Sequence, residues 1–388
     1  MGELALPHLV QSILELNAEQ SAAYEAASFA RRRYWAEHPT FFAALKCMDG
    51  RLNLSRITRM PIGLFKPYRS LGGRFEIYWP AFINMRLRAW VAKAANKASF
   101  NSIFVTYHYS ASDNDALGCT GWHQDTQAAI GHAKELCEQL RYIFLDQVVP
   151  IVTGIETDRD ILILHGPHHD VRGNTLMGCT NDHIHQCLGD AFGDEMPDVV
   201  RQDLVPFLSG NSEHIASLGN RPLDRSVLGH TERILAIGQG FEWLAAGKRK
   251  ALIINDSTVD LREPIETAGR ILAENLKGTP EDDHALIFTN VPFEDALGQR
   301  IAHKKGPGLL KFARDVLSKT QPELWKSGRL EVLVGSTDER DMRLSTIETG
   351  LIMPDGTFQL FNAPSTRITH SARSNGGSHP HSTDTAID

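Results

Sequence analysis

Two cysteines and a histidine in the first third of the chain form a set of side chains that could bind zinc. Cys47 comes first, and His108 and Cys119 follow further along. Thiolate and imidazole are ligands that Zn²⁺ prefers, and a catalytic zinc keeps three protein ligands when its fourth position must hold water. These residue types therefore predict a metal centre that activates water. The alternative is a closed structural zinc site with a fourth protein ligand.

Asp49 and Arg51 stand beside the first cysteine, within the sequence Cys-Met-Asp-Gly-Arg at 47–51. A carboxylate held by a guanidinium is the kind of pair that orients a water molecule next to a metal. In a closed structural site this pair would have no clear purpose. For the pair taken by itself, the alternative explanation is an ordinary salt bridge at a turn.

The elements expected around these residues place two of the ligands at the ends of strands. Residues 8–37 have helical spacing of apolar positions, and the apolar run 42–47 predicts a buried strand that ends at an Asp-Gly turn. A further strand is expected at 102–107, directly before His108. Since ligands gather outside the carboxyl ends of strands in open α/β sheets, Cys47 and His108 lie where this rule requires.

The remaining pattern alternates between strands and helices. Strands are expected at 62–68, 148–153 and 161–165, and helices at 81–98, 122–147, 197–208 and 211–218. This alternation predicts an α/β fold with a mainly parallel sheet flanked by helices.

From about residue 231 the order of expected elements repeats. It comprises strands at 233–239 and 285–289 and a helix at 259–276. The strand sequence Ser-Ile-Phe-Val-Thr at 102–106 resembles Ala-Leu-Ile-Phe-Thr at 285–289, and Asp-Ala-Leu-Gly occurs at both 115–118 and 295–298. Chance likeness between two apolar strands is the alternative explanation.

In this alignment the second copy lacks the metal ligands, because Gln299 replaces Cys119 and Val291 replaces His108. It is therefore expected to be a degenerate, metal-free copy. The tail is rich in Ser, Thr, His and Gly and poor in apolar residues, which predicts disorder. The expected parts are a helical N-terminal segment (1–37), a zinc-binding catalytic domain (38–228), a degenerate repeat domain (229–364) and a disordered tail (365–388).

Composition excludes several classes of protein. The net charge of the 388-residue chain is −7, and no basic patch is interleaved with aromatic residues, so we expect no nucleic-acid partner. No apolar run approaches the ~18 residues of a membrane span, and no signal peptide opens the chain. The 5 cysteines are odd in number and widely spaced, which favours a reducing compartment and a cytoplasmic protein.

The sequence at 47–51 matches the Cys-x-Asp-x-Arg signature of the β-class carbonic anhydrases, which take their zinc from this Cys, a later His and a later Cys. Ordinary members place the last two as His-x-x-Cys, whereas His108 and Cys119 are eleven positions apart. The carboxysome shell carbonic anhydrases share this wider interval and carry a degenerate, metal-free second half. The stretch Val-Thr-Gly-Ile-Glu-Thr-Asp-Arg-Asp at 152–160 also resembles that branch.

This resemblance implies a β-carbonic-anhydrase fold and the reversible hydration of CO₂ to bicarbonate and a proton. It implies one zinc per chain, bound by Cys47, His108 and Cys119, with Asp49 and Arg51 as catalytic residues. Asp49 would accept a hydrogen bond from the zinc-bound hydroxide while Arg51 holds it ionised. In the alternative resting state, also known in the family, Asp49 takes the place of water as the fourth ligand.

His123 is the nearest candidate for a proton acceptor, with an ordinary surface histidine as the alternative. Carbonyl sulfide or carbon disulfide hydrolysis on the same fold is a competing activity. A non-catalytic, zinc-stabilised assembly protein of the shell is a competing class. The resemblance further implies a homo-oligomer, the carboxysome shell or Rubisco as partners, and the interior of a carboxysome as an alternative location within the cytoplasm.

A second group of histidines and cysteines has no tetrahedral spacing, so a polar surface loop or an oligomer contact is expected there instead of a metal site. It comprises His165, His168, His169, Cys179, His183, His185 and Cys187.

Overall fold

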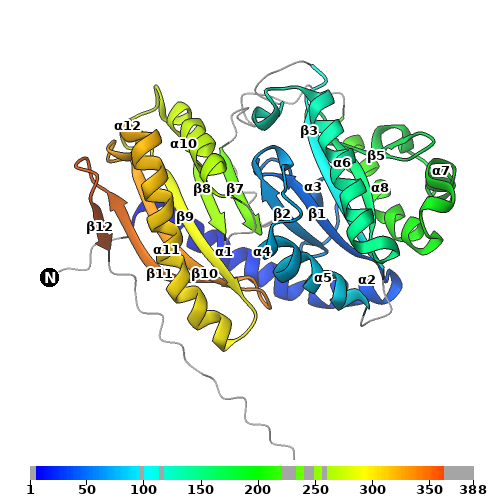
Figure 1. Cartoon of the computed structure of the whole chain (residues 1–388), viewed down its shortest axis with the longest axis horizontal. Coiled ribbons are helices and arrows are strands. Elements are labelled where there is room, and N and C mark those ends of the chain that lie inside the picture. Colours follow the sequence, from blue (N-terminus) through cyan, green and yellow to red (C-terminus); the bar gives the residue numbers. More distant parts are fainter. Residues whose placement is uncertain are drawn as a thin grey trace, which may run out of the picture.

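The computed structural model describes residues 6–95, 100–112, 118–219, 233–239, 249–255 and 260–361. Within this part of the chain, twelve strands form one sheet in the order β12-β11-β10-β9-β8-β7-β2-β1-β3-β4-β5-β6 (Figure 1). The strands are β1 Phe41–Cys47, β2 Phe65–Ser70, β3 Asn101–Tyr109, β4 Val149–Glu156, β5 Ile161–His165, β6 Asp170–Arg172, β7 Ile234–Gln239, β8 Ala251–Asn255, β9 Ala285–Phe293, β10 Leu330–Asp338, β11 Arg343–Ile352 and β12 Phe358–Phe361. The α-helices are α1 His8–Ala26, α2 Ser28–Glu37, α3 Leu54–Ile57, α4 Pro80–Phe82, α5 Arg88–Ala95, α6 Thr126–Phe144, α7 Asn181–Phe192, α8 Asp198–Leu218, α10 Arg262–Leu276, α11 Ala296–Thr320 and α12 Pro322–Trp325.

The sheet consists of two halves that meet where β2 and β7 pair antiparallel. In the first half β2, β1, β3 and β4 are parallel, and β5 and β6 follow antiparallel. In the second half β7, β8, β9 and β10 are parallel, and β11 and β12 follow antiparallel. The expected α/β fold with a mainly parallel sheet is confirmed, although β5 runs opposite to its neighbour β4.

Burial on both faces explains why the central strands are almost continuously apolar. Every residue of β8 is buried, and so is every residue of β3 except its last. Parallel strands covered by helices on both faces have this composition. On α6, Ala129, Ala133, Leu136 and Leu140 are buried at spacings of four, three and four residues, which is the apolar stripe of a helix that packs on a sheet.

The N-terminal helices contact both halves of the molecule. On α1, Val10 and Ile13 join a core cluster formed with strands of the second half. At the end of α2, the imidazole of His38 lies 3.0 Å from a carboxylate oxygen of Asp203 on α8, in the first half. The helical segment expected at 8–37 is confirmed, with a break at Ala27.

Several expected boundaries were wrong. The strand expected at 62–68 is β2, which begins at Phe65, and the helix expected from residue 122 is α6, which begins at Thr126 after a short 3-10 turn. The two helices expected at 197–208 and 211–218 are one helix, α8. Strand β8 was missed. Residues 96–98 of the expected helix at 81–98, residues 231–232 and the expected disordered tail lie outside the described residues.

The second half repeats the sequence of strand directions in the first but not its strand order. Strand β1, the first in its half, lies between β2 and β3. Strand β7, the first in its half, lies instead at the centre of the whole sheet, beside β8. The first two strands have therefore exchanged places, and the degenerate second copy stays a prediction.

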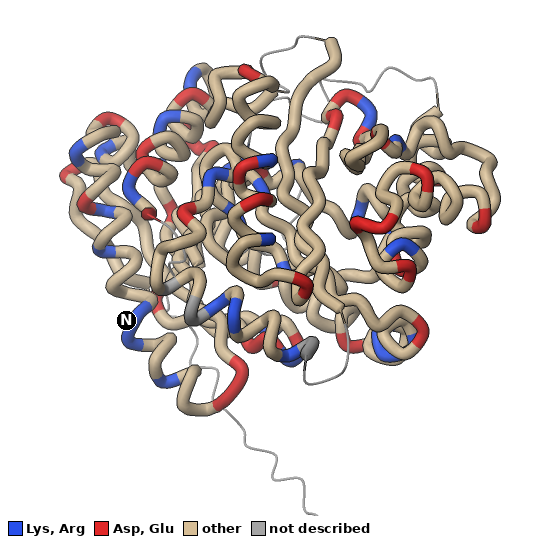
Figure 2. The backbone as a smooth tube through the Cα atoms, turned by 45° about the vertical axis from the view of Figure 1, so that its right-hand side comes forward, with Lys and Arg blue, Asp and Glu red and all other residues tan. Residues whose placement is uncertain are grey.

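Charged residues of both signs are interspersed along the chain (Figure 2). Among the described residues, no helix combines the length and the apolar character that crossing a membrane requires.

Candidate metal centre

Cys47, His108 and Cys119 come together at the carboxyl ends of two adjacent parallel strands. Cys47 is the last residue of β1, His108 is the next-to-last of β3, and Cys119 directly precedes the 3-10 turn that leads into α6. Their ligand atoms all lie within 4.8 Å of one another. The Sγ atoms of Cys47 and Cys119 are 4.0 Å apart. Two thiolates on a tetrahedral zinc, each at about 2.3 Å, would be about 3.8 Å apart, so the spacing suits this metal.

The surroundings of His108 also fit a metal ligand. Its side chain is 2% exposed, and among the described residues neither ring nitrogen has a hydrogen-bond partner. A buried polar atom without a partner destabilises a fold, and a bound cation would remove that cost. The contact with Cys119 and burial together raise the pKa of the Cys47 thiol well above its usual value. The thiolate form therefore needs a cation beside it, and this donor set fits Zn²⁺.

Asp49 and Arg51 form a bidentate ion pair next to these ligands. The backbone N–H of Arg51 donates to Asp49 Oδ1 at 2.8 Å and its Nη2 donates to Oδ2 at 2.6 Å. The Nε of Arg51 donates to both oxygens, at 3.0 Å to Oδ1 and 2.8 Å to Oδ2. Burial of Asp49 acts to raise its pKa, but attraction and hydrogen bonds from Arg51 hold that pKa below its ordinary value. Asp49 is thus an ionised carboxylate bound to Arg51, and among the described residues the metal-ligand cluster contains only the Cys–His–Cys set.

Two buried cations that sequence reasoning missed fix the loop after Cys47. Arg69 Nη1 donates to the carbonyls of Cys47 at 3.1 Å and Asp49 at 2.8 Å, and its Nη2 donates to that of Leu52 at 3.0 Å. Lys46 Nζ also donates to the Leu52 carbonyl, at 2.8 Å. Lys46 stands in an otherwise apolar strand, which was a signal that could have found it, whereas Arg69 lies in a strand that also contains Lys66 and Ser70.

The second half of the molecule holds the same loop from the other side. The backbone N–H of Gly50 donates to the carbonyl of Ile234 at 2.7 Å, and that of Ala236 donates to the carbonyl of Met48 at 2.8 Å. The loop that follows Cys47 therefore pairs with strand β7 through backbone hydrogen bonds, so the second half supports the candidate metal centre directly.

Cys119 is positioned by a close approach of two backbones. Trp122 Nε1 donates to the carbonyl of Gly72 at 2.7 Å. A Cβ on Gly121 would lie 2.6 Å from the backbone nitrogen of Gly72, so a side chain at Gly121 would push the two loops apart. The loop that carries Cys119 thus packs against residues 71–73, which directly follow β2. This packing places the Sγ of Cys119 near the Sγ of Cys47.

His123, the candidate proton acceptor, lies on an exposed turn with a φ of 48° four residues after Cys119. Its role stays a prediction.

The second group of histidines and cysteines is spread over a strand, a turn and a helix, so the expected single loop was wrong. His183, His185 and Cys187 lie on α7, and the His183 Nε2 to Cys187 Sγ distance is 3.6 Å. His165 ends β5, where its Nε2 lies 2.8 Å from the Tyr107 hydroxyl. Among the described residues, the grouping of His, Cys and acidic side chains with metal-ligand spacing is the one at Cys47.

A mainly parallel α/β sheet with a buried Cys–His–Cys set and a bidentate Asp–Arg pair beside it is compatible with a metal centre of the β-carbonic-anhydrase type. Residues 41–192 match the model of the carboxysome shell carbonic anhydrase catalytic domain. The matched segment runs from the first residue of β1 to the last of α7 and contains the residues of this centre.

A curated relative points to the same family. The chain is 25% identical over 230 residues to a protein of Hydrogenovibrio crunogenus (strain DSM 25203 / XCL-2) named carboxysome shell carbonic anhydrase. The similarity covers 50% of this chain and 44% of the relative, so it spans less than half of that protein's length.

Proposed function

We propose that this chain is a zinc-dependent carbonic anhydrase that interconverts CO₂ and bicarbonate. The observation that carries the proposal is the buried Cys47–His108–Cys119 cluster beside the Asp49–Arg51 pair, within the segment that matches the family model. Three ligands leave a fourth position for water, which is the arrangement of catalytic zinc sites.

Zinc bound by these ligands would lower the pKa of a water molecule enough for it to attack CO₂ near neutral pH. The chain's own residues do the rest. Asp49 is ionised, so its carboxylate can accept a hydrogen bond from the water or hydroxide that zinc would bind. That hydrogen bond would orient the remaining lone pairs of the water or hydroxide oxygen. Arg51 engages both carboxylate oxygens and keeps Asp49 from turning toward the metal.

Because its pKa is lowered, Asp49 stays ionised and can orient a hydrogen-bond donor. For the same reason it is a poor acceptor for the proton that the reaction releases. That proton must leave through another group. The exposed His123, close to Cys119 in the chain, is our candidate for it.

The proposal extends to the setting of the enzyme. We infer one zinc per chain, a homo-oligomer, and a place in the carboxysome with its shell or Rubisco as partners. The family model that matches residues 41–192 and the name of the Hydrogenovibrio relative support this setting.

The test combines metal analysis with stopped-flow CO₂ hydration on the wild type, Asp49→Asn and Asp338→Asn. Asp338 is a matched control because it forms the same kind of pair with Arg340, far from the metal centre in sequence. We expect about one zinc per chain in all three proteins and a hydration rate that falls about 10²-fold or more only in Asp49→Asn, since the loss of one oriented polar group at a reacting centre has effects of this size.

Equal rates in the wild type and Asp49→Asn would refute the catalytic role, and zinc-loaded wild type without activity would refute the function. Carbonyl sulfide hydrolysis, measured on the same samples, distinguishes the competing activity on the same fold.

A further inference from the structure

The chain that leaves the metal centre after His108 is fastened by one carboxylate. Asp158 Oδ2 accepts hydrogen bonds from Ser110 Oγ at 2.9 Å and from the backbone N–H of Ala111 at 2.7 Å, and its Oδ1 accepts one from Ser112 Oγ. These three residues begin the stretch that leads from His108 to Cys119. One side chain thus fixes the start of the interval between two metal ligands.

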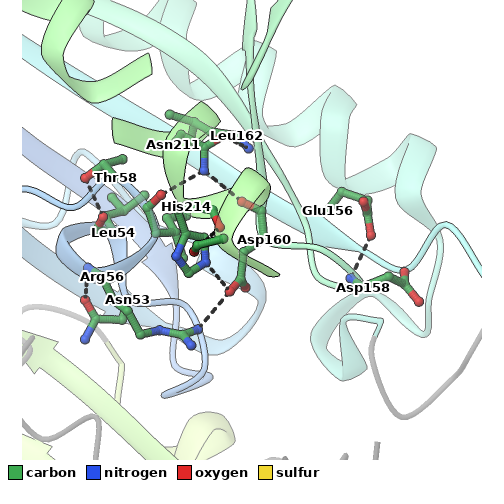
Figure 3. Close-up of polar contacts among 12 residues, drawn as sticks. Asn53, Leu54, Arg56, Thr58, Glu156, Asp158, Asp160, Leu162, Asn211 and His214 are labelled. Atoms are coloured by element: carbon green, nitrogen blue, oxygen red, sulfur yellow. Dashed lines mark hydrogen bonds and ion pairs between the residues drawn. The ribbon is translucent and has the colours of Figure 1, made fainter. Parts of the chain in front are cut away.

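Asp158 is itself held in place by its neighbours. Its backbone N–H donates to Glu156 Oε1 at 2.7 Å (Figure 3), and Thr157 donates to the carbonyl of Tyr109 through both its N–H and its Oγ1, at 2.9 and 3.0 Å. Burial opposes ionisation of Asp158, but the hydrogen bonds from Ser112 and from its other donors lower its pKa. The carboxylate is therefore charged and points at the chain that it holds.

The same turn also contacts the segment that follows the first ligand. Asp160 Oδ2 lies 3.2 Å from Arg56 Nη2 on α3 and 2.9 Å from His214 Nε2 on α8 (Figure 3). The side chain of Asn211 donates to the Asp160 carbonyl at 2.9 Å. Because α3 follows the Cys-Met-Asp-Gly-Arg loop in the chain, the turn at 157–160 connects to both arms of the metal centre.

We propose that Asp158 is a positioning residue for this metal centre, one that fixes residues 110–112, where the chain leaves His108. The proposal rests on the function proposed above. The two ligands are eleven positions apart, and a longer connection has more conformations that must be excluded before both ligands point at one ion. Three hydrogen bonds to an ionised side chain on the adjacent strand connection remove that freedom on the His108 side, and the Trp122 contact does so on the Cys119 side.

The experiment measures metal geometry and affinity directly. The full-length wild type, Asp158→Ala, Asp158→Asn and the control Asp338→Asn are loaded with Co²⁺, whose visible bands report ligand geometry. Affinity is measured by competition with a chelator, and folding by far-ultraviolet circular dichroism and thermal unfolding. Removing a residue that orients a metal ligand lowers metal affinity about 10–100-fold. We expect that loss and altered cobalt bands in Asp158→Ala, a smaller change in Asp158→Asn, and no change in Asp338→Asn.

A purely structural role predicts a lower melting temperature with unchanged cobalt bands and affinity, and that result would overturn the proposal. If Asp158→Ala fails to fold, Asp158→Asn and Ser112→Ala decide the matter on the same two readouts. Failure of the proposed function looks different. Wild type that binds cobalt with thiolate bands but does not hydrate CO₂ after zinc loading would remove the function and leave the positioning role intact. Wild type that binds no metal would overturn both.

Discussion

Two Asp-x-Arg pairs in this molecule have similar local geometry in different surroundings. In both Asp49–Arg51 and Asp338–Arg340, the arginine donates its backbone N–H to one carboxylate oxygen and its Nη2 to the other. The Nε of Arg340 donates to the first oxygen, and the Nε of Arg51 donates to both. Arg340 is 66% exposed, whereas Arg51 is 22% exposed and Asp49 is fully buried. The surface pair is the ordinary salt bridge at a turn. Burial beside a Cys–His–Cys cluster makes the other pair a candidate for chemistry.

The strand ends of the two halves also differ in whether their buried polar side chains have hydrogen-bond partners. In the second half, Asn290 Nδ2 donates to Asn255 Oδ1 at 2.9 Å, and Thr337 Oγ1 donates to Asn290 Oδ1 at 2.9 Å. These three side chains are buried and satisfy one another. In the first half, both ring nitrogens of His108 lack a hydrogen-bond partner among the described residues. The carboxyl edge of a parallel sheet can thus be closed by a polar network or left with ligand atoms for an ion, and only the second choice allows chemistry.

The largest effect should follow from removing a ligand. Cys47→Ser replaces a thiolate with a poor zinc ligand, so we expect loss of bound zinc and a fall in CO₂ hydration of about 10³-fold or more, because the metal supplies the nucleophile. Zinc analysis and stopped-flow hydration check this. Cys137→Ser is the control, since Cys137 is a buried thiol on α6 with a pKa raised by burial to about 12. Full zinc content in Cys47→Ser would contradict the assigned ligand set.

The second-largest effect should follow from removing Arg51, with Arg340 as the matched control. Arg51→Ala leaves Asp49 free to turn, and we expect CO₂ hydration to fall about 10–100-fold with zinc retained, the usual size for loss of a partner that orients a group at a metal site. Arg340→Ala should leave the rate unchanged and alter the free energy of unfolding by about 0–1 kcal/mol, as for other exposed ion pairs. Equal rates in the two variants would mean that the buried pair has no more catalytic role than the surface pair.

The candidate residues of this site could be picked out from the sequence because the features that mark them are local. An apolar run that ends at Cys47, a second that ends near His108, and the Asp and Arg two and four residues after Cys47 can all be recognised without knowing which strands are neighbours. The contacts of Arg69 with the Cys47 loop and the pairing of β7 with Met48 and Gly50 could not be predicted in this way. They depend on strand pairing between segments far apart in the chain. The periodicity of apolar residues predicts a strand and its buried face, but it does not predict which strand lies beside it.

The same limit explains why strand β8 of the second half was missed. The likeness between 102–106 and 285–289 found the third strand of each half, and both occupy the third position from the centre of the sheet. The strand β8 was missed because a five-residue apolar run is ambiguous by itself. Its place between β7 and β9 is a property of the assembled sheet.

The polar network of the second half provides a prediction about stability. Asn290→Ala leaves the buried Asn255 and Thr337 side chains without their shared partner, so we expect a loss of about 1–3 kcal/mol in the free energy of unfolding. Zinc content should not change, because this residue belongs to the half without ligands. Urea unfolding and metal analysis are the measurements. A loss of zinc in Asn290→Ala would show that the support that β7 gives the Cys47 loop depends on this polar network.

The smallest effect concerns the last residues of the fourth strands, Glu156 on β4 and Asp338 on β10. Burial raises the pKa of Glu156 to about 7 from an ordinary value of 4.5, whereas Arg340 lowers that of Asp338 despite its burial. Between pH 4.5 and about 7 the unfolded chain has lost the Glu156 proton while the folded chain retains it. The folded state binds more protons in this window, so the contribution of Glu156 to stability falls as pH rises and is constant above it.

Glu156→Gln should therefore gain stability relative to the wild type between pH 5 and pH 8, by on the order of 1 kcal/mol. Asp338→Asn should show the opposite sign. The lowered pKa of Asp338 stabilises the folded state above its ordinary pKa of 3.8, so this variant loses stability at pH 5 and pH 8 alike and regains it only in acid. Urea unfolding of the three proteins at pH 3, 5 and 8 measures both trends, and the difference between variant and wild type cancels the pH dependence of metal binding. A constant difference between Glu156→Gln and the wild type from pH 5 to pH 8 would mean that Glu156 ionises as freely in the fold as in the unfolded chain.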